Sequence, residues 1–212
     1  MSRSKMLKNL HALGENERLK NDNTEQNEKL LIAVKNRSLE DVATAIKNGA
    51  NVNCFEQFEK EKMANVFRNS PLHICAENGE FEISKLLIDN CADIEQRNLF
   101  LFCKTPLANF NKHPLKFDKI SVGSTPLHVA AACNKKEIVE LLIKTEANLE
   151  AVNKIGNTAL HCAAFSEASE VCRILLFASY KKASAFEVSL NSCGLTAYDL
   201  ALSEEVICKT KT

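Results

Sequence analysis

The chain has 212 residues, of which 45% are hydrophobic and 25% are charged, a composition typical of a folded globular protein. This length predicts one domain or two small ones. The 27 basic residues equal the 27 acidic ones, so the chain lacks the basic excess with which nucleic-acid binders neutralise phosphates. No apolar run reaches the ~18 residues of a membrane span, and Met1–Leu13 contains no apolar stretch resembling a signal peptide. We therefore expect a folded protein that binds no nucleic acid and has no membrane span.

The N-terminal part of the sequence is polar. Residues 1–27 are nearly balanced in charge and show no sustained apolar periodicity, so we expect a flexible tail there. The first helical patterns follow at residues 30–34 and 39–42. A turn is predicted at 48–53, where Gly49 suits a backbone of positive φ.

A short motif then recurs four times. A Ser or Thr precedes a run of apolar and small residues in each copy, and the copies are residues 70–76, 125–131, 158–164 and 196–202. The hydroxyl of Ser70 or Thr125 can cap a helix, and the proline that follows each of them fits the first helical turn. Second helical patterns follow at 81–88 and 136–143. Such short helices cannot bury their apolar faces alone, so the units are expected to stack.

The recurring Thr-Pro-Leu-His motif, followed by turns such as Asn-Gly-Ala-Asn, resembles the ankyrin-repeat family. The resemblance covers roughly residues 28–208. It implies an all-α repeat solenoid, a stack of helix–turn–helix units with projecting β-hairpin fingers. We expect about five repeats including caps, at residues 28–60, 68–98, 124–153, 156–190 and 194–208. The end repeats depart from the pattern, because Leu31 and Asp199 stand where the other repeats carry histidine.

The spacing of the repeats indicates insertions. Equivalent positions from Leu30 to Leu72, Leu127, Leu160 and Tyr198 are successively 42, 55, 33 and 38 residues apart, against a family period of ~33. The excesses of ~9, ~22 and ~5 residues are predicted to lie in the fingers. We interpret the largest insertion, residues 99–122, as a long finger. The alternative is a truncated repeat that begins at Thr105-Pro106-Leu107, which matches the start of the motif.

The sequence shows no arrangement that indicates catalysis, a cofactor or a metal ion. Because the family uses the histidine of its motif for hydrogen bonds between repeats, we interpret His73, His128 and His161 as structural. They are one repeat or more apart, too far to share one ion. The nine cysteines include no C-x-x-C pair, and we interpret them as reduced thiols in a cytoplasmic protein, those in apolar runs being buried. We expect no enzyme activity and a monomer.

The resemblance implies a non-catalytic protein–protein interaction module that binds a partner through its concave face and fingers. Carried over by position, it predicts partner contacts at Asn69, Glu77, Asn78, Ala132, Cys133, Lys154, Ile155, Asn157, Phe165 and Ser166. The long insertion adds aromatic and basic candidates, namely Phe100, Phe102, Phe110, Phe117, Lys112 and Lys116. The alternative for its phenylalanines is that they fold back and pack against the stack. The alternative is a structural or regulatory ankyrin block that acts as a spacer or inhibitor in a larger complex.

The composition also gives a hypothesis about origin. The chain has 21 lysines but only 6 arginines, and asparagine is abundant, which is typical of an AT-rich genome. Together with the irregular fingers, this resembles effectors that intracellular bacteria deliver into the host cytosol. An effector role would place the protein in that compartment.

Overall fold

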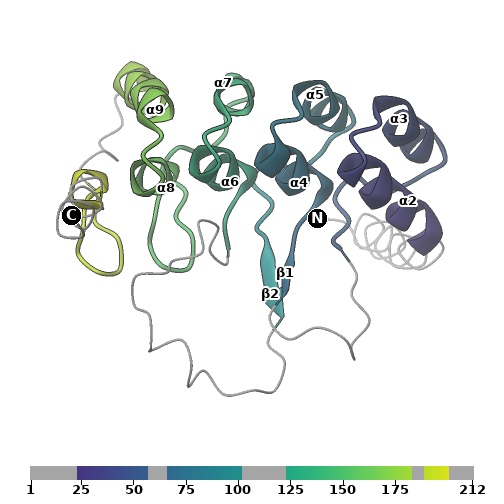
Figure 1. The fold of residues 1–212 in the computed structure, drawn as a ribbon, viewed down its shortest axis with the longest axis horizontal. Coiled ribbons are helices and arrows are strands. Elements are labelled where there is room, and N and C mark those ends of the chain that lie inside the picture. Colours follow the sequence, from purple (N-terminus) through teal and green to yellow (C-terminus); the bar gives the residue numbers. More distant parts are fainter. Residues whose placement is uncertain (1–22, 57–65, 102–122, 183–188, 201–212) are drawn as a thin grey trace, which may run out of the picture.

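The chain folds into a row of helix pairs (Figure 1). The computed structural model describes residues 23–56, 66–101, 123–182 and 189–200. The helix pairs are α2 (Thr24–Lys35) with α3 (Leu39–Lys47), α4 (Pro71–Asn78) with α5 (Phe81–Asp89), α6 (Pro126–Ala132) with α7 (Lys136–Lys144), and α8 (Ala159–Phe165) with α9 (Ser169–Lys182). Residues 197–200 are again helical. The predicted all-helical repeat stack is confirmed.

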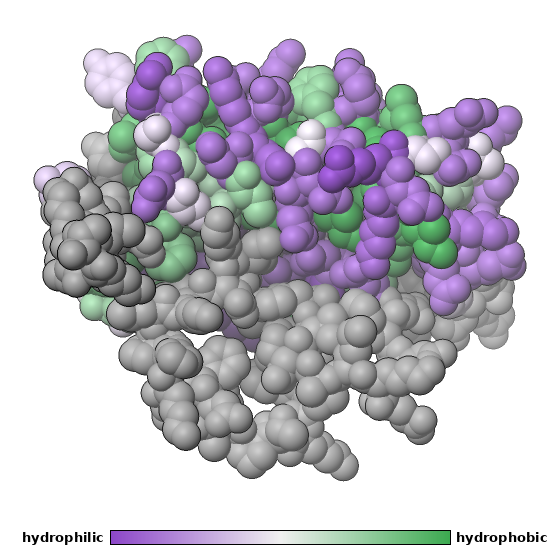
Figure 2. Space-filling view, viewed as in Figure 1, coloured by the Kyte–Doolittle hydropathy of each residue, from purple (hydrophilic) through white to green (hydrophobic). Residues whose placement is uncertain are grey.

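The first and second helices of each pair form two layers. In Figure 1 the first helices (α2, α4, α6, α8) lie in one row, the second helices form an outer row, and the connecting loops project to the opposite side. Every residue of α6 is buried, whereas α7 buries only Ile138, Val139 and Leu142. Paired alanines such as Ala130 and Ala131 have no exposed surface, because neighbouring helices approach closely there. The outer row is amphipathic, and in Figure 2 hydrophobic residues are interspersed with polar ones along it.

The first helix begins earlier than predicted. Helix α2 starts at Thr24, four residues before the expected boundary at residue 28. The side-chain amide of Asn23 donates to the carbonyl of Gly49 at 2.5 Å, and the side-chain oxygen of Asn27 accepts from the backbone N–H of Asn51 at 2.7 Å. These bonds tie the first turn of α2 to the loop after α3. A polar sequence therefore joins the repeat through hydrogen bonds that hydrophobic periodicity does not reveal. The rest of the predicted tail, residues 1–22, lies outside the described residues.

The fingers have a common base. In the finger at 153–157, the N–H of Asn153 donates to the carbonyl of Asn157 at 3.0 Å, and the side chain of Asn153 accepts from the N–H of Asn157. Asn98 and Ser124 make the same pair of bonds at 2.9 and 2.8 Å. Residues 99–122 therefore leave and re-enter the stack at the place where the regular finger has only Lys154 and Ile155.

Two strands leave neighbouring fingers and pair with each other. Strand β1 (Val66–Arg68) is antiparallel to β2 (Leu99–Leu101), with Val66 opposite Leu101 and Arg68 opposite Leu99. Because β1 enters α4 while β2 follows α5, the pair joins the first finger to the long second one (Figure 1). The predicted candidates Phe102, Phe110, Phe117, Lys112 and Lys116 lie outside the described residues.

One predicted insertion lies elsewhere. The excess of ~5 residues before the last repeat was expected in a finger, but the finger at Asn191–Leu195 has the same length and base as that at 153–157. The extra residues lengthen α9, which has 14 residues where α3, α5 and α7 each have nine. The prediction was wrong because an interval between motifs does not show which element within it has grown.

Candidate protein-binding face

Three histidines fix the fingers relative to the first helices. The Nε2 atoms of His73, His128 and His161 lie 2.9, 2.9 and 3.1 Å from the carbonyl oxygens of Ser124, Asn157 and Leu195, each at the finger base of the following repeat. A carbonyl oxygen only accepts, so Nε2 carries the proton and donates. Equivalent histidines thus repeat one bond along the stack, which confirms the structural interpretation of these residues.

The other ring nitrogen closes the start of each histidine's own helix. Nδ1 of His128 accepts from the hydroxyl of Thr125 at 2.8 Å and from its backbone N–H at 3.2 Å. Burial lowers the pKa of His73 and of His128 to about 4. Protonation of Nδ1 would also place its new N–H against the backbone N–H that donates to it in the neutral ring, which disfavours the charged form. Both rings are therefore neutral and lock the cap and the finger together at pH 7.

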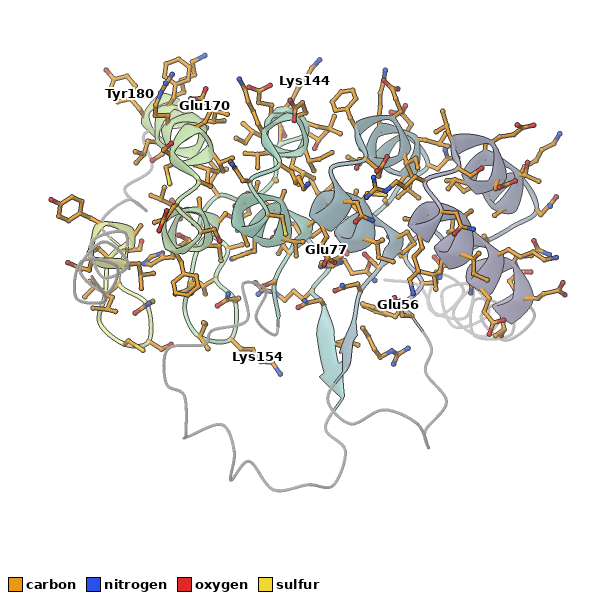
Figure 3. All side chains as sticks on the ribbon, viewed as in Figure 1. Glu56, Glu77, Lys144, Lys154, Glu170 and Tyr180 are labelled. Carbon is orange, nitrogen blue, oxygen red and sulfur yellow. The ribbon has the colours of Figure 1, made fainter. Side chains whose placement is uncertain are left out.

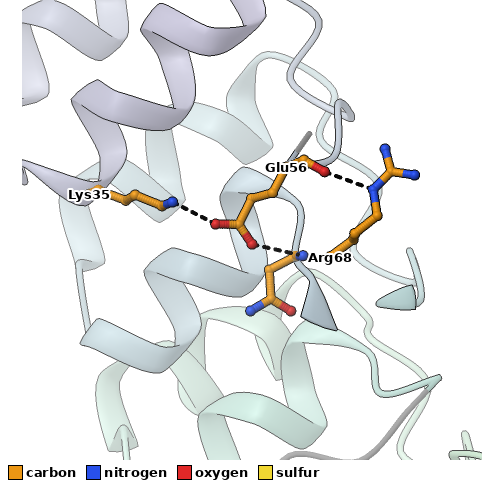
Figure 4. Close-up of polar contacts among 4 residues, drawn as sticks. Lys35, Glu56 and Arg68 are labelled. Atoms are coloured by element: carbon orange, nitrogen blue, oxygen red, sulfur yellow. Dashed lines mark hydrogen bonds and ion pairs between the residues drawn. The ribbon is translucent and has the colours of Figure 1, made fainter. Parts of the chain in front are cut away.

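The first junction lacks this histidine and uses an ion pair instead (Figure 4). Leu31 occupies the histidine position and is buried. Lys35 of α2 pairs with Glu56 at 2.7 Å, and Glu56 accepts from the backbone N–H of Asn69 at 3.1 Å through its other oxygen. The backbone carbonyl of Glu56 also accepts from Nε of Arg68 at 2.7 Å. Sequence analysis missed Glu56, because it stands where the other fingers have asparagine and an insertion separates it from the motif.

The last junction also differs from the histidine pattern. Asp199 accepts from the hydroxyl of Thr196 at 2.7 Å and from its backbone N–H at 2.8 Å. The backbone and side-chain bonds from Thr196 hold the pKa of Asp199 below its ordinary value. A carboxylate has no N–H to offer the carbonyl of a further finger, so Asp199 closes its own helix only.

The C-terminal ends of the first helices and the finger at 153–157 form the candidate binding face. Seven residues after the caps Ser70, Thr125 and Thr158, the repeats carry Glu77, Ala132 and Phe165 in turn. Lys35, four residues after Leu31, is the equivalent residue of the first repeat. Glu77 is exposed and Phe165 is half-buried, while Lys154 is exposed on the finger. Figure 3 shows Glu77, Glu56 and Lys154 on the finger side of the stack.

Some predicted contact residues have structural roles instead. Ala132 has an exposed fraction of only 2%, so the expectation that its side chain is available to a partner was wrong; a methyl group is too short to emerge between the neighbouring helices. The backbone carbonyl of Asn157 accepts a hydrogen bond from His128, and its side-chain oxygen accepts one from the side-chain amide of Asn191 at 2.9 Å. Asn69 likewise bonds to Glu56 through its backbone. A repeated Asn-x-x-Gly pattern five residues before the cap could have identified these finger bases.

The structure also gives the positions of the other predicted residues that it describes. Asn78, Cys133 and Ser166 directly follow Glu77, Ala132 and Phe165 at the ends of α4, α6 and α8, and each is half-buried. Ile155 is half-buried in its finger beside Lys154. Phe100 belongs to β2, at the beginning of the long insertion. The face therefore combines a carboxylate, an aromatic ring and a finger ammonium, with cysteine and amide groups between them.

Several thiols of the stack are buried. The seven cysteines that the structure describes are free. Burial raises the pKa of Cys54, Cys75 and Cys162 to about 12, so these thiols stay protonated and are poor nucleophiles. Within the described ranges, no three His, Cys, Asp or Glu side chains are grouped so that they could hold a metal ion.

Comparison with known proteins gives the family. A family model described as ankyrin repeats (three copies) matches residues 98–187, and a single ankyrin-repeat model matches residues 67–99. Together the two matches cover more than half of the chain. The chain belongs to the ankyrin-repeat family. Ankyrin repeats are protein–protein interaction units and are typically non-catalytic. None of the helices within the described part of the chain is long and apolar enough to cross a membrane.

Similar proteins come from viruses and vertebrates. The ankyrin repeat protein FPV031 of fowlpox virus is 26% identical over 181 residues, which are 84% of this chain and 44% of that protein. The NF-kappa-B p105 subunit of Gallus gallus is 34% identical over 79 residues, covering 37% of this chain and 8% of that protein. The ankyrin repeat protein OPG189 of monkeypox virus is 39% identical over 70 residues, covering 33% and 11%. The chain thus spans less than half the length of these relatives.

Proposed function

We propose that this ankyrin stack binds a protein partner across the finger side of its first helices. The observation that carries the proposal is the contrast between core and surface positions in equivalent repeats. The buried Leu-His pair of the motif recurs in three successive repeats, whereas the position four residues after this histidine, or after Leu31 in the first repeat, changes. It is an exposed Lys35, an exposed Glu77, a buried Ala132 and a half-buried Phe165. Packing does not dictate the identity of the three members that keep exposed surface, Lys35, Glu77 and Phe165, so these can be fitted to a particular partner.

The geometry supports the proposal in two ways. The histidine bonds hold the fingers at fixed positions, so little conformational entropy is lost when a partner binds there. Phe165 is half-buried at the helix end, and an aromatic side chain anchored in this way is a typical hot spot of protein interfaces. The long insertion at 99–122 leaves from a finger base on the same side, and we interpret it as an extended finger that adds contacts.

Affinity purification from a eukaryotic lysate tests the proposal. Wild type is compared with Glu77→Lys, with Phe165→Ala and with Tyr180→Ala, a control on the opposite, outer edge of the stack (Figure 3), where Tyr180 is 83% exposed. We expect a protein that is captured by wild type and the control, but not by the two variants of the face.

A different result would favour the alternative role as a spacer or inhibitory block. If the Glu77 and Phe165 variants captured the same proteins as wild type, the face would not be the binding surface. The hypothesis of a bacterial effector in host cytosol rests on composition and finger irregularity alone. Its test is the source genome, which would have to be that of an intracellular bacterium.

A further inference from the structure

The outer row of helices carries a second surface at α7 and α9, on the side of the stack away from the fingers. Helix α9 is five residues longer than α7, which extends it by about 7 Å. Two of its large apolar side chains point outward, Leu176 with 40% and Phe177 with 61% of its surface exposed. Figure 3 shows the residues of this region, Lys144, Glu170 and Tyr180, on the opposite side of the stack from Glu77 and Lys154.

A groove runs between these two helices. We name it the α7–α9 groove, and its volume is about 670 Å³. Its apolar lining comes from Ile143 of α7 and from Ile174, Leu176, Phe177 and Ala178 of α9. On α9 the lining residues 174, 177, 178 and 181 follow helical spacing, so they form one stripe that faces α7.

Growth of the stack would leave this groove open. The outer helices α3, α5, α7 and α9 lie in one row (Figure 1), and a further repeat packs against the side of α9 that faces away from α7. The groove lies over the seam between two helices that are already neighbours. An additional ankyrin unit therefore does not account for its exposed apolar lining.

The charges around the groove are mostly positive. Lys144, Arg173 and Lys181 line it, against the single carboxylate of Glu140. Nζ of Lys181 lies 4.5 Å from the centre of the Phe177 ring. Arg173 pairs with Glu170 at 3.1 Å, while Lys144 forms no ion pair with any residue that the structure describes. The apolar stripe is thus flanked by cations that attract a negatively charged partner.

We propose that the α7–α9 groove binds an acidic amphipathic helix of a partner protein. The partner's apolar residues, spaced i, i+3 or i+4, contact Ile174 and Phe177, and its Asp or Glu residues lie beside Lys144 and Lys181. A helix fits better than an extended strand because the lining offers no sheet edge with which a strand could pair, whereas a helix satisfies its own backbone hydrogen bonds. This surface is separate from the proposed finger-side face and does not depend on it.

Selection from a display library of helical peptides tests the proposal, using the full chain as target. The peptides are about 16 residues long, or about four turns. Phe177→Glu is the test variant. Ile32→Glu is the matched control, since Ile32 is 57% exposed at the other end of the stack. We expect selected peptides with more Asp and Glu than Lys and Arg, which bind wild type and the control equally and Phe177→Glu at least about tenfold more weakly. Lys144→Glu should also weaken them, and added salt should do the same.

Four outcomes would overturn the proposal. Peptides that bind all variants equally would place the binding surface elsewhere, and selected peptides rich in Lys or Arg would contradict the charge argument. Dimerisation of the chain that Phe177→Glu abolishes would identify a second copy as the occupant. A large fall in the melting temperature of Phe177→Glu, absent from Ile32→Glu, would show that the chain itself covers the groove.

Discussion

Acid should destabilise this stack through its buried histidines. In the folded chain the pKa of His73 and of His128 is lowered from the ordinary 6.5 to about 4. At a pH between these two pKa values, the histidines are therefore protonated in the unfolded chain but neutral in the folded chain. The stability that these rings contribute is present above pH 6.5, falls as the pH drops below it, and is lost once the pH passes below 4.

The size of the effect follows from the two pKa values. A histidine with these values loses about 2 kcal/mol of its contribution between pH 7 and pH 5, so the two together lose about 4 kcal/mol. A domain of this size is commonly stable by about 5–15 kcal/mol, so the loss is a large fraction of the total. Most carboxylates titrate below this interval, which makes the histidines the main source of the slope.

Urea unfolding followed by circular dichroism at pH 7, 6 and 5 measures the free energy of unfolding directly. The control is His128→Leu, which copies the natural occupant of the position in the first repeat, Leu31. The carbonyl of Asn157 keeps its bond from Asn153 in this variant. We expect the variant to be less stable at pH 7 and to lose less stability than wild type on acidification, because His128 no longer contributes while burial still lowers the pKa of His73 and of His161. Equal slopes in wild type and variant, or no fall in stability between pH 7 and pH 5, would refute the reasoning.

Three further substitutions test the local geometry by the same unfolding assay. Gly156→Ala should destabilise by more than Gly194→Ala. Both positions have positive φ, which costs an alanine about 1–2 kcal/mol, but the new Cβ at 156 would also lie 2.7 Å from a backbone nitrogen of the next finger, while that at 194 meets nothing within 4 Å. Equal losses would show that the fingers do not pack as described. Glu167→Gly should stabilise by about 0.5–1 kcal/mol, since this residue has a φ of 54°, and no gain would mean that the turn is unstrained. Lys35→Met should cost about 1 kcal/mol of stability, because it leaves the nearly buried carboxylate of Glu56 without its cation. Lys29→Met breaks an exposed ion pair and should cost less than about 0.5 kcal/mol. Similar losses would argue that the first junction does not depend on its ion pair.

Much of the repeat unit could be predicted from the sequence because its determinants are local. The cap residue, the proline after it and the apolar run of 126–132 specify a helix without reference to distant residues. His73, His128 and His161 recur at one position, and the resemblance to the family implied a structural hydrogen bond there, which the distances confirm. Units with the same local sequence pattern stack on one another in the same way, so repetition of the motif predicts the repeat stack of the family.

The tertiary structure decided the features that depend on residues far apart in the chain. Glu56 links α2 to the first finger only because folding brings it to Lys35 and Asn69, and Ala132 is buried only because helices on both sides cover it. The spacing of motifs gave the number of extra residues before the last repeat, but not that they extend α9, nor that a groove lies between α9 and α7. Periodicity and capping act over a few residues, whereas ion pairs, burial and grooves arise from neighbours that the chain acquires on folding.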